Sequence, residues 1–307
     1  MTNYKNKYGK VAVLMGGLSA EREISLQSGN AVLNALLEND VDAHTLDVGK
    51  DVVQQLIGGN YDRVFNMLHG RVGEDGVIQG AMELLELPYT GSGVLASAVG
   101  MDKLRTKEIW LANDLPTPNF YIVDDKTNPD VIIKNLGLPI IIKPLREGSS
   151  IGMSKVNTAE ELKPALENAM QYDAHVLAEK WIEGDEYTAA VVDRQSLPLI
   201  RLETPNIFYD YEAKYVSNTT NYHCPCGLPQ DKEKELQVLA LEAFDALGAS
   251  GWGRVDMMMD ASGIVYLIEI NTLPGMTDHS LVPMAAKQAG IDFNALVMKI
   301  LDSSLSE

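Results

Sequence analysis

The order of apolar and polar positions in the first hundred residues predicts strands separated by helices. Residues 10–17 (KVAVLMGG) form a short apolar run that ends in glycines, which indicates a buried strand followed by a turn. Residues 19–38 carry apolar side chains at helical spacing. Two further apolar runs, at 63–70 and around 87–93, predict more strands. Strands that alternate with helices in this way predict a parallel sheet.

Beyond residue 100 the pattern changes from alternating strands and helices to hairpins. The expected elements are a helix over 101–114, a strand, glycine-rich loop and strand over 137–156, a helix over 159–170, a strand over 175–184, a strand over 186–193, an irregular stretch over 203–230, a helix over 231–248, a hairpin and a final helical segment. The three textures divide the chain into parts at 1–100, 101–186 and 187–307. The fold class is α/β, with mixed α+β parts after the first.

The late hairpin joins GWGRVDMMMD to IVYLIEIN through a turn that contains a glycine. A turn of two or four residues would place Arg254 opposite Glu269 and Asp256 opposite Leu267. Because alternate strand residues share a face, Arg254, Asp256, Glu269 and Asn271 would then project from one side of the sheet. A turn of odd length without a bulge would break this arrangement.

Composition adds limits on the partners of the chain. The chain has 307 residues, of which 46% are apolar and 22% charged, as in ordinary folded proteins. Its net charge of −18 repels phosphate backbones and anionic lipid surfaces, so neither nucleic acid nor a membrane is an expected partner. No apolar run approaches the length of a membrane span or of a signal peptide core, and we expect a cytoplasmic protein.

Cys224 and Cys226 are the two cysteines of the sequence, and one adjacent pair cannot build a framework of disulfides. His223 beside them suggests zinc. A zinc site needs a fourth ligand and the usual cysteine spacing, and the sequence shows neither. Loop thiols without a metal are therefore the preferred interpretation.

Several polar residues fit the binding of a nucleotide and a metal ion. Asp256, Glu269 and Asn271 offer the hard oxygen ligands that Mg²⁺ prefers, although a solvated sheet face would also be polar. The loop REGSSIG at 146–152 could cover phosphates with its backbone N–H groups, but glycine-rich turns are common. Lys143 strengthens the phosphate interpretation, because a lysine in a buried strand is costly unless it meets an anion.

Other candidates have plain structural alternatives. Glu179, Trp181 and Glu186 could surround an adenosine group, or could belong to an ordinary strand and turn. Glu21 lies in a first helical turn, where the helix dipole alone favours an acid, and by itself this explanation is preferred. His69 ends an expected parallel strand, at the edge where ligands bind, but a hydrogen-bonded strand-end histidine is equally compatible.

Together these segments resemble the D-alanine:D-alanine ligases of the ATP-grasp superfamily. The resemblance rests on GGLSAEREISLQSG, LHGRVGEDG, PYTGSG, MDKLRTK, IIKPLREGSSIGMSKV, EKWIEG, FYDYEAKY, CPCGLP, GWGRVDMM and EINTLPGMTDHSLVP, in this order over residues 16–283. It implies an ATP-grasp fold in which ATP lies between two antiparallel sheets. It also implies that one D-alanine carboxylate attacks the γ-phosphate of ATP, and that the amine of a second D-alanine then displaces phosphate to give the dipeptide.

The resemblance assigns a role to each matching position. Glu21 would hold the ammonium group of the first substrate with His69 nearby, and Ser149 and Tyr215 would link to Glu21 and close the loop FYDYEAKY over the substrates. The remaining roles fall to Lys103, Lys143 and Lys214 for phosphates; Glu179, Lys180, Trp181, Ile182 and Glu186 for adenine and ribose; Asp256, Glu269 and Asn271 for two Mg²⁺ or Mn²⁺ ions; Arg254 and the Gly275 backbone for the reacting carboxyl; and Ser280 and Leu281 for the second substrate.

Two other functions compete with this one. A related ligase could join D-alanine to D-lactate or D-serine, but Tyr215 argues against the D-lactate version, since members that favour D-lactate lack it. A nucleotide-binding regulator without turnover would not need Arg254 beside all three metal ligands. Leu273 and Cys226 depart from the family pattern without touching the assigned residues. The resemblance also implies a homodimer and a role in peptidoglycan precursor synthesis in the bacterial cytoplasm.

Overall fold

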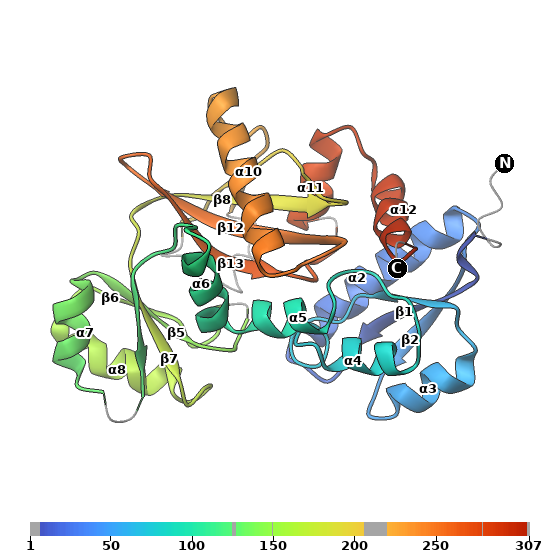
Figure 1. Cartoon of the computed structure of the whole chain (residues 1–307), viewed down its shortest axis with the longest axis horizontal. Coiled ribbons are helices and arrows are strands. Elements are labelled where there is room, and N and C mark those ends of the chain that lie inside the picture. The colour runs from blue at the N-terminus through green and yellow to red at the C-terminus, as the bar shows by residue number, and fades with distance from the viewer. Residues whose placement is uncertain (1–6, 125–126, 149, 206–219, 278, 306–307) are drawn as a thin grey trace.

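The part of the chain that the structure describes contains three β-sheets, which lie in different regions of the molecule (Figure 1). The structure, a computed structural model, describes residues 7–124, 127–148, 150–205, 220–277 and 279–305. A three-stranded sheet holds the N-terminal part, a four-stranded sheet the middle, and a six-stranded sheet most of the remainder. Within the described residues, no helix has both the length and the apolar character needed to cross a membrane.

Strands and helices follow each other as the sequence predicts over most of the chain. The strands are β1 (Lys10–Gly16), β2 (Asp42–Val48), β3 (Arg63–Asn66), β4 (Phe120–Val123), β5 (Ile140–Pro144), β6 (Ser154–Val156), β7 (Val176–Lys180), β8 (Gly184–Val192), β9 (Gln195–Ser196), β10 (Ile200–Glu203), β11 (Asn221–His223), β12 (Trp252–Asp260) and β13 (Val265–Asn271). The helices are α2 (Arg22–Glu38), α3 (Val52–Gly59), α4 (Val77–Leu84), α5 (Val94–Met101), α6 (Lys103–Ala112), α7 (Pro129–Leu136), α8 (Ala159–Ala169), α10 (Gln230–Ala246), α11 (Leu281–Gln288) and α12 (Phe293–Ser303).

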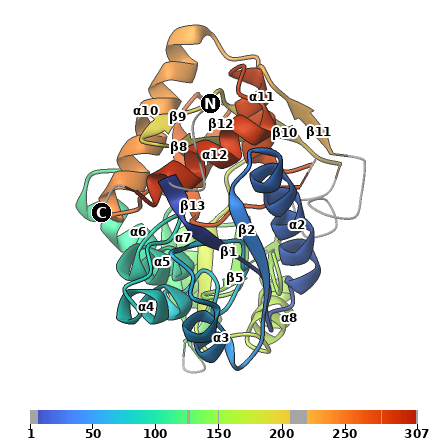
Figure 2. The same cartoon turned by 90° about the vertical axis from the view of Figure 1, so that its right-hand side faces the viewer.

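The N-terminal sheet is parallel, as expected, and has the order β2-β1-β3. Odd residues of β1, such as Val13, pack in one core with α2 and α12, and even residues, such as Leu14, pack with α3 and α4 in another. Helices therefore cover both faces of this sheet, and Figure 2 shows β1 and β2 with α2 on one side and α3 and α4 on the other. The prediction of a strand around 87–93 is wrong, because that segment forms only a single isolated β-bridge, between Val64 and Tyr89.

The four-stranded sheet, of order β4-β7-β5-β6, is apolar on the face that packs against α7 and α8. Ile140 and Ile142 of β5 and Ala178 of β7 point into that core. Because strand side chains alternate between faces, Lys143, which follows Ile142, and Glu179, which follows Ala178, lie on the opposite face. This is the face that looks toward the six-stranded sheet.

The six-stranded sheet has the order β11-β10-β8-β12-β13, with β9 paired to β8. Tyr187, Val255 and Leu267 pack on one face with α10 and also with Trp110 of α6. On the other side, Val192 and Trp252 share a core with α11, α12 and the N-terminal sheet. Helices therefore pack against both faces of this sheet.

The pairing of β12 with β13 differs from the predicted register. Arg254 pairs with Asn271 and Asp256 with Glu269, rather than with Glu269 and Leu267 as expected. The register shifts by one residue after Asp256, which is a β-bulge. The last pair of the hairpin is Met259 with Val265, which encloses five residues, an odd number. The bulge therefore restores the alternation and keeps all four polar residues on one face.

Candidate active site

A cleft of about 540 Å³ lies between the four-stranded and six-stranded sheets. Both sheets and the crossing from β7 to β8 contribute polar residues to its walls. The assigned residues that line it are Lys143, Glu179, Lys180, Trp181, Ile182, Glu186, Asp256 and Glu269. The structure therefore gathers in one cleft residues that lie more than 120 positions apart in the chain.

Glu179 forms a buried ion cluster in the wall of this cleft. One carboxylate oxygen lies 2.7 Å from Nζ of Lys143, and the other lies 2.6 Å from Nζ of Lys107. Burial opposes the charged form of Glu179, but the two lysines outweigh it and lower the pKa of the carboxyl. Lys143 thus meets an anion, as its position in a buried strand requires, and in this structure that anion is Glu179.

The other nucleotide residues lie along the edge of the cleft. The ammonium group of Lys155 lies over the ring of Trp181, 4.1 Å from the ring centre, in a cation–π contact. Lys180 donates from Nζ to the Leu138 carbonyl at 3.3 Å. Lys103 is not among the lining residues of the cleft and donates instead to the carbonyl of Glu147, in the glycine-rich loop, at 2.5 Å. Lys214 lies outside the described residues.

Arg254 and Asp256 form a bidentate ion pair on the cleft-facing side of β12. Nε and Nη2 of Arg254 lie 2.8 and 2.7 Å from the two carboxylate oxygens. Thr188 donates to the same carboxylate at 2.6 Å, and the Asn271 amide donates at 3.1 Å. Glu269 faces Asp256 across the strand pair. The three assigned metal ligands therefore lie together, with Asp256 at their centre.

A smaller hollow of about 60 Å³ adjoins this hairpin and contains the residues assigned to the amino acid substrates. Its lining includes Glu21, His69, Gly148, Arg254, Asn271, Leu273, Gly275, His279, Ser280 and Leu281. The strands β12 and β13 thus contribute to both hollows, with Asp256 and Glu269 in the larger and Arg254 and Asn271 in the smaller. Ser149 and Tyr215 lie outside the described residues.

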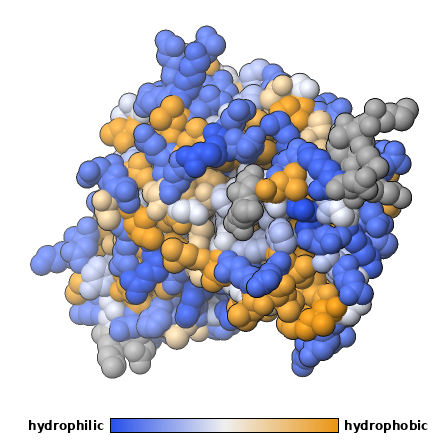
Figure 3. All heavy atoms as spheres, turned by 45° about the vertical axis from the view of Figure 1, so that its right-hand side comes forward, coloured by the Kyte–Doolittle hydropathy of each residue, from blue (hydrophilic) through white to orange (hydrophobic). Residues whose placement is uncertain are grey.

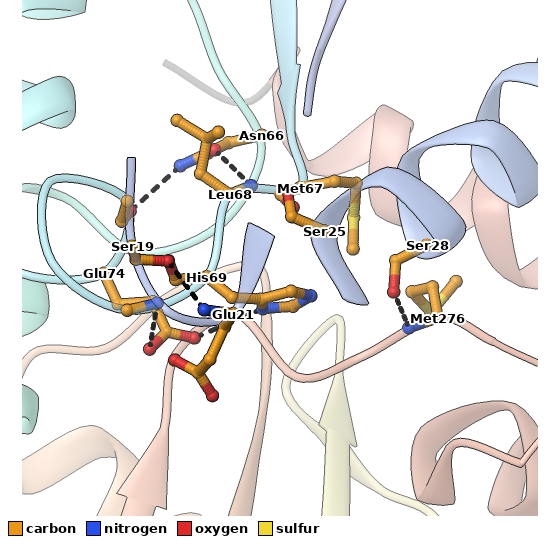
Figure 4. A network of polar contacts seen from close by, with 12 residues as sticks. Ser19, Glu21, Ser25, Ser28, Asn66, Met67, Leu68, His69, Glu74 and Met276 are labelled. Carbon is orange, nitrogen blue, oxygen red and sulfur yellow. Dashed lines mark hydrogen bonds and ion pairs between the residues drawn. The ribbon is translucent and has the colours of Figure 1, made fainter. Parts of the chain in front are cut away.

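Glu21 is the N-cap residue of α2, but its side chain makes no capping hydrogen bond. Its carboxylate instead points toward the loop after β3, beside His69 and Glu74 (Figure 4). Gly70 has a φ of +70°, which favours glycine, and a Cβ there would lie 2.8 Å from Oε2 of Glu21, so the carboxylate lies close to this loop. This orientation favours a role in the hollow over the helix-dipole explanation.

His69 is buried and faces Glu74, with 3.5 Å between Nδ1 and the nearer carboxylate oxygen. Burial disfavours the charged imidazole, but the hydrogen bond and charge of Glu74 and the charge of Glu21 outweigh it, and the pKa of His69 is raised. Burial, together with the charge of Glu21, raises the pKa of Glu74. The group is therefore a coupled acid–base cluster beside the substrate hollow.

Serines of α2 and of the loop before it hold the loops that carry these groups. Ser19 donates to the His69 carbonyl and Ser25 to the Met67 carbonyl, both at 2.7 Å, while Ser28 accepts from the Met276 amide at 3.0 Å (Figure 4). Near Met276, Ser280 accepts from the Thr277 amide at 2.8 Å. Both walls of the substrate hollow are thus tied to α2 or to the segment leading into it.

Three polar residues of the site were missed from the sequence. Lys107 is a fully buried lysine whose partner lies 72 residues away, so neither spacing nor pattern marks it. Thr188 is one of many polar residues in an apolar strand, and only the pairing of β8 with β12 brings it to Asp256. Glu74 follows His69 in the loop HGRVGED, where the nearness of an acid to a histidine was a usable signal.

Comparison with known families is decisive once this geometry is established. Sequence models described as the N-terminus and the C-terminus of D-ala D-ala ligase match residues 51–92 and 109–302. The chain belongs to the D-alanine–D-alanine ligase family. A relative from Nitrosococcus oceani named D-alanine--D-alanine ligase is 61% identical over 298 residues, which is 97% of this chain and 94% of that protein.

Solved structures of this ligase family share the whole fold. A D-alanine--D-alanine ligase from Bacillus anthracis complexed with ATP superposes with a TM-score of 0.86 at 32% identity, covering 96% of this chain and 97% of that one. A VanG D-Ala:D-Ser ligase from Enterococcus faecalis superposes with a TM-score of 0.85 at 30% identity, covering 97% and 99%. The expected ATP-grasp fold, with its cleft between two antiparallel sheets, is confirmed.

Proposed function

We propose that the protein joins two D-alanine molecules to D-alanyl-D-alanine, with conversion of ATP to ADP and phosphate, and so supplies peptidoglycan synthesis. The observation that carries this proposal is that one hairpin lines both the cleft and the smaller hollow. The hairpin β12–β13 contributes Asp256 and Glu269 to the cleft that fits a nucleotide, and Arg254 and Asn271 to the hollow that fits small amino acids. A phosphoryl group in the cleft and a carboxylate in the hollow would meet at this hairpin.

In the substrate hollow, Glu21 would bind the ammonium group of the first D-alanine, with His69 beside it. This leaves the carboxylate of that D-alanine to attack the γ-phosphorus of ATP, which forms an acyl phosphate and releases ADP. The amine of the second D-alanine, held through Ser280 and Leu281, then attacks the acyl carbon and displaces phosphate. Exclusion of water from this hollow during the reaction would protect the acyl phosphate from hydrolysis.

Arg254 is assigned to the charge that develops on the reacting carboxyl oxygen, together with the backbone of Gly275. Its pair with Asp256 uses Nε and Nη2 and fixes the plane of the guanidinium group. Donors held in place before the reaction stabilise a transition state without the cost of reorienting them.

We also propose that Mg²⁺ or Mn²⁺ binds at Asp256, Glu269 and Asn271, as two ions. Two carboxylates and an amide oxygen on one sheet face fit a hard divalent cation, and the described residues contain no cluster of three His, Cys, Asp or Glu, so phosphate oxygens and water would complete the coordination. Such ions would neutralise charge on the phosphates. Turning the Asn271 amide by 180° would present its oxygen.

Three further proposals concern organisation. The chain divides into parts at residues 1–100, 101–186 and 187–307, acts in the bacterial cytoplasm, and forms a homodimer.

Exposed apolar residues on neighbouring helices support a dimer interface in the N-terminal part. They are Val77 and Leu84 of α4 and Leu95 of α5. Figure 3 shows one face of the molecule, where hydrophobic residues form patches among hydrophilic ones. Sedimentation at several protein concentrations tests the dimer.

Specificity for the second substrate distinguishes this proposal from its nearest alternative. The likeness to a D-Ala:D-Ser ligase favours D-serine as the second candidate. The test incubates the protein with Mg²⁺-ATP and D-alanine alone, D-alanine with D-serine, or D-alanine with D-lactate, and identifies products by mass. We expect the D-alanine dipeptide to dominate in all three. A mixed product as the major species would move the assignment to the alternative, and absence of any product would remove the ligase function.

A further inference from the structure

Lys107 is a lysine on α6 that no assigned role explains. Lys107 is 0% exposed and is not among the residues that line the ATP cleft. Its Nζ lies 2.6 Å from Oε2 of Glu179 and donates to Oγ1 of Thr117 at 2.7 Å. Thr117 in turn donates to the Leu267 carbonyl of β13 at 2.9 Å. The lysine is therefore tied to both sheets of the cleft while staying behind its wall.

The charges of the cluster give this arrangement a consequence for ATP binding. Glu179 is shared by Lys107 behind the wall and Lys143 on its cleft side. With Lys143 alone, the two charges would cancel and the wall would present a neutral pair. With Lys107 added, the cluster of Lys107, Lys143 and Glu179 has a net positive charge of one beside the cleft. An excess buried charge is unfavourable unless an anion approaches it.

We propose that Lys107 is a positioning residue that neutralises Glu179 from behind, so that Lys143 keeps its positive charge for the phosphates of the nucleotide. The inference rests on the proposed function only in taking the cleft as the ATP site. Lys107 touches neither ATP nor amino acid and acts through Glu179 and Lys143. The assigned metal ligand Glu269 also attracts Lys107, on the side of β13.

Titration gives an independent signature of this role. Burial lowers the pKa of Lys107 to about 8, although Glu179 opposes the change. Glu179 on β7, Lys143 on β5 and Glu269 on β13 are the charged groups that act on it. Since the protonated lysine favours an anionic ligand, the affinity for ATP should fall as the pH rises through this pKa, with no matching change for a neutral ligand.

The experiment measures binding of ATP and of adenosine by calorimetry, without D-alanine, for the wild-type protein and Lys107→Met. We expect ATP to bind about 10-fold more weakly to the variant, because Glu179 would then neutralise Lys143 and weaken its charge-assisted contact with the phosphates. The affinity for adenosine should not change. Between pH 7 and 9, ATP affinity should decline in the wild type and stay flat in the variant. Arg105→Met, on the exposed side of the same helix, serves as the control and should match the wild type.

Thr117→Val provides a second variant that leaves every charge in place, should Lys107→Met fail to fold. It removes the hydroxyl that holds Lys107, and we expect a smaller loss of ATP affinity, again without loss for adenosine. Equal weakening of ATP and adenosine would overturn the proposal, because it indicates a distorted cleft. Unchanged ATP affinity in either variant would do the same. Because D-alanine is omitted, failure of the ligase assay would leave this result intact.

Discussion

Replacing Arg254 by methionine isolates the residue assigned to the reacting carboxyl. The side chain of Arg254 is 11% exposed and holds Asp256 through two short contacts. Methionine keeps much of the volume and apolar length and removes all the donors. Thr188 and Asn271 would still bind the Asp256 carboxylate, so one partner rather than all is lost.

The expected magnitude follows from the location of Arg254. It lines the substrate hollow but not the 540 Å³ cleft, so the change should spare ATP binding. Loss of one preorganised donor to a developing negative charge lowers turnover by about 10²–10³-fold, or about 2.7–4 kcal/mol of transition-state stabilisation. The loss should therefore fall on kcat, with the KM for ATP changed by less than about 3-fold, which corresponds to about 0.7 kcal/mol.

Coupled ADP release at saturating D-alanine measures kcat, and an ATP titration gives the KM. Arg254→Lys is the matched control, because it keeps the charge and loses the bidentate geometry, and we expect intermediate turnover. Thermal unfolding of each variant identifies losses that come from misfolding. Wild-type turnover in Arg254→Met, or a defect confined to the KM for ATP, would refute the role assigned to this residue.

Three further predictions concern the other charged groups. Asp256→Asn should raise the Mg²⁺ concentration needed for half-maximal ADP release by about 10-fold, and an unchanged titration would remove Asp256 from the ligand set. Glu21→Gln should raise the KM for D-alanine by about 10-fold while leaving that for ATP unchanged, since a charge-assisted contact is lost; equal effects on both substrates would contradict it. Because the folded pKa of Glu179 is lowered, its stabilisation is present above the ordinary value of 4.5 and is lost as the pH falls below it. Glu179→Gln should reduce the free energy of unfolding at pH 7 by about 3–5 kcal/mol, by leaving Lys107 and Lys143 buried without their anion, and should flatten its acid dependence; wild-type stability in urea would count against the cluster.

The sequence predicted the sheets well wherever local pattern determines structure. The strand and helix at 10–38, the hairpin around the glycine-rich loop and the late hairpin all form as expected. The strand β2 was not predicted, because DAHTLDV mixes polar and apolar positions and pairs only through β1. The register of β12 with β13 was wrong because a bulge and an odd turn compensate each other, and neither is visible in the pattern of side chains.

The site was predictable in its parts rather than in its connections. The residues on the hairpin share a face because of strand alternation, which the sequence shows directly. The bond from Lys107 to Glu179 depends on how α6 packs between two sheets, and no local pattern encodes it. The same holds for Ser28, which binds a backbone amide 248 residues away. Long-range partners of this kind need the folded chain.

Transfer of an isotope from substrate to phosphate tests the central claim most directly. The protein is incubated with Mg²⁺-ATP and D-alanine labelled with ¹⁸O in both carboxyl oxygens, and phosphate, ADP and peptide are analysed by mass. If the first carboxylate attacks the γ-phosphorus and phosphate then leaves the acyl carbon, each phosphate carries one ¹⁸O, and ADP and dipeptide form in equal amounts. Dipeptide formed with unlabelled phosphate would contradict the acyl phosphate route, and ADP formed without dipeptide would contradict the ligase itself.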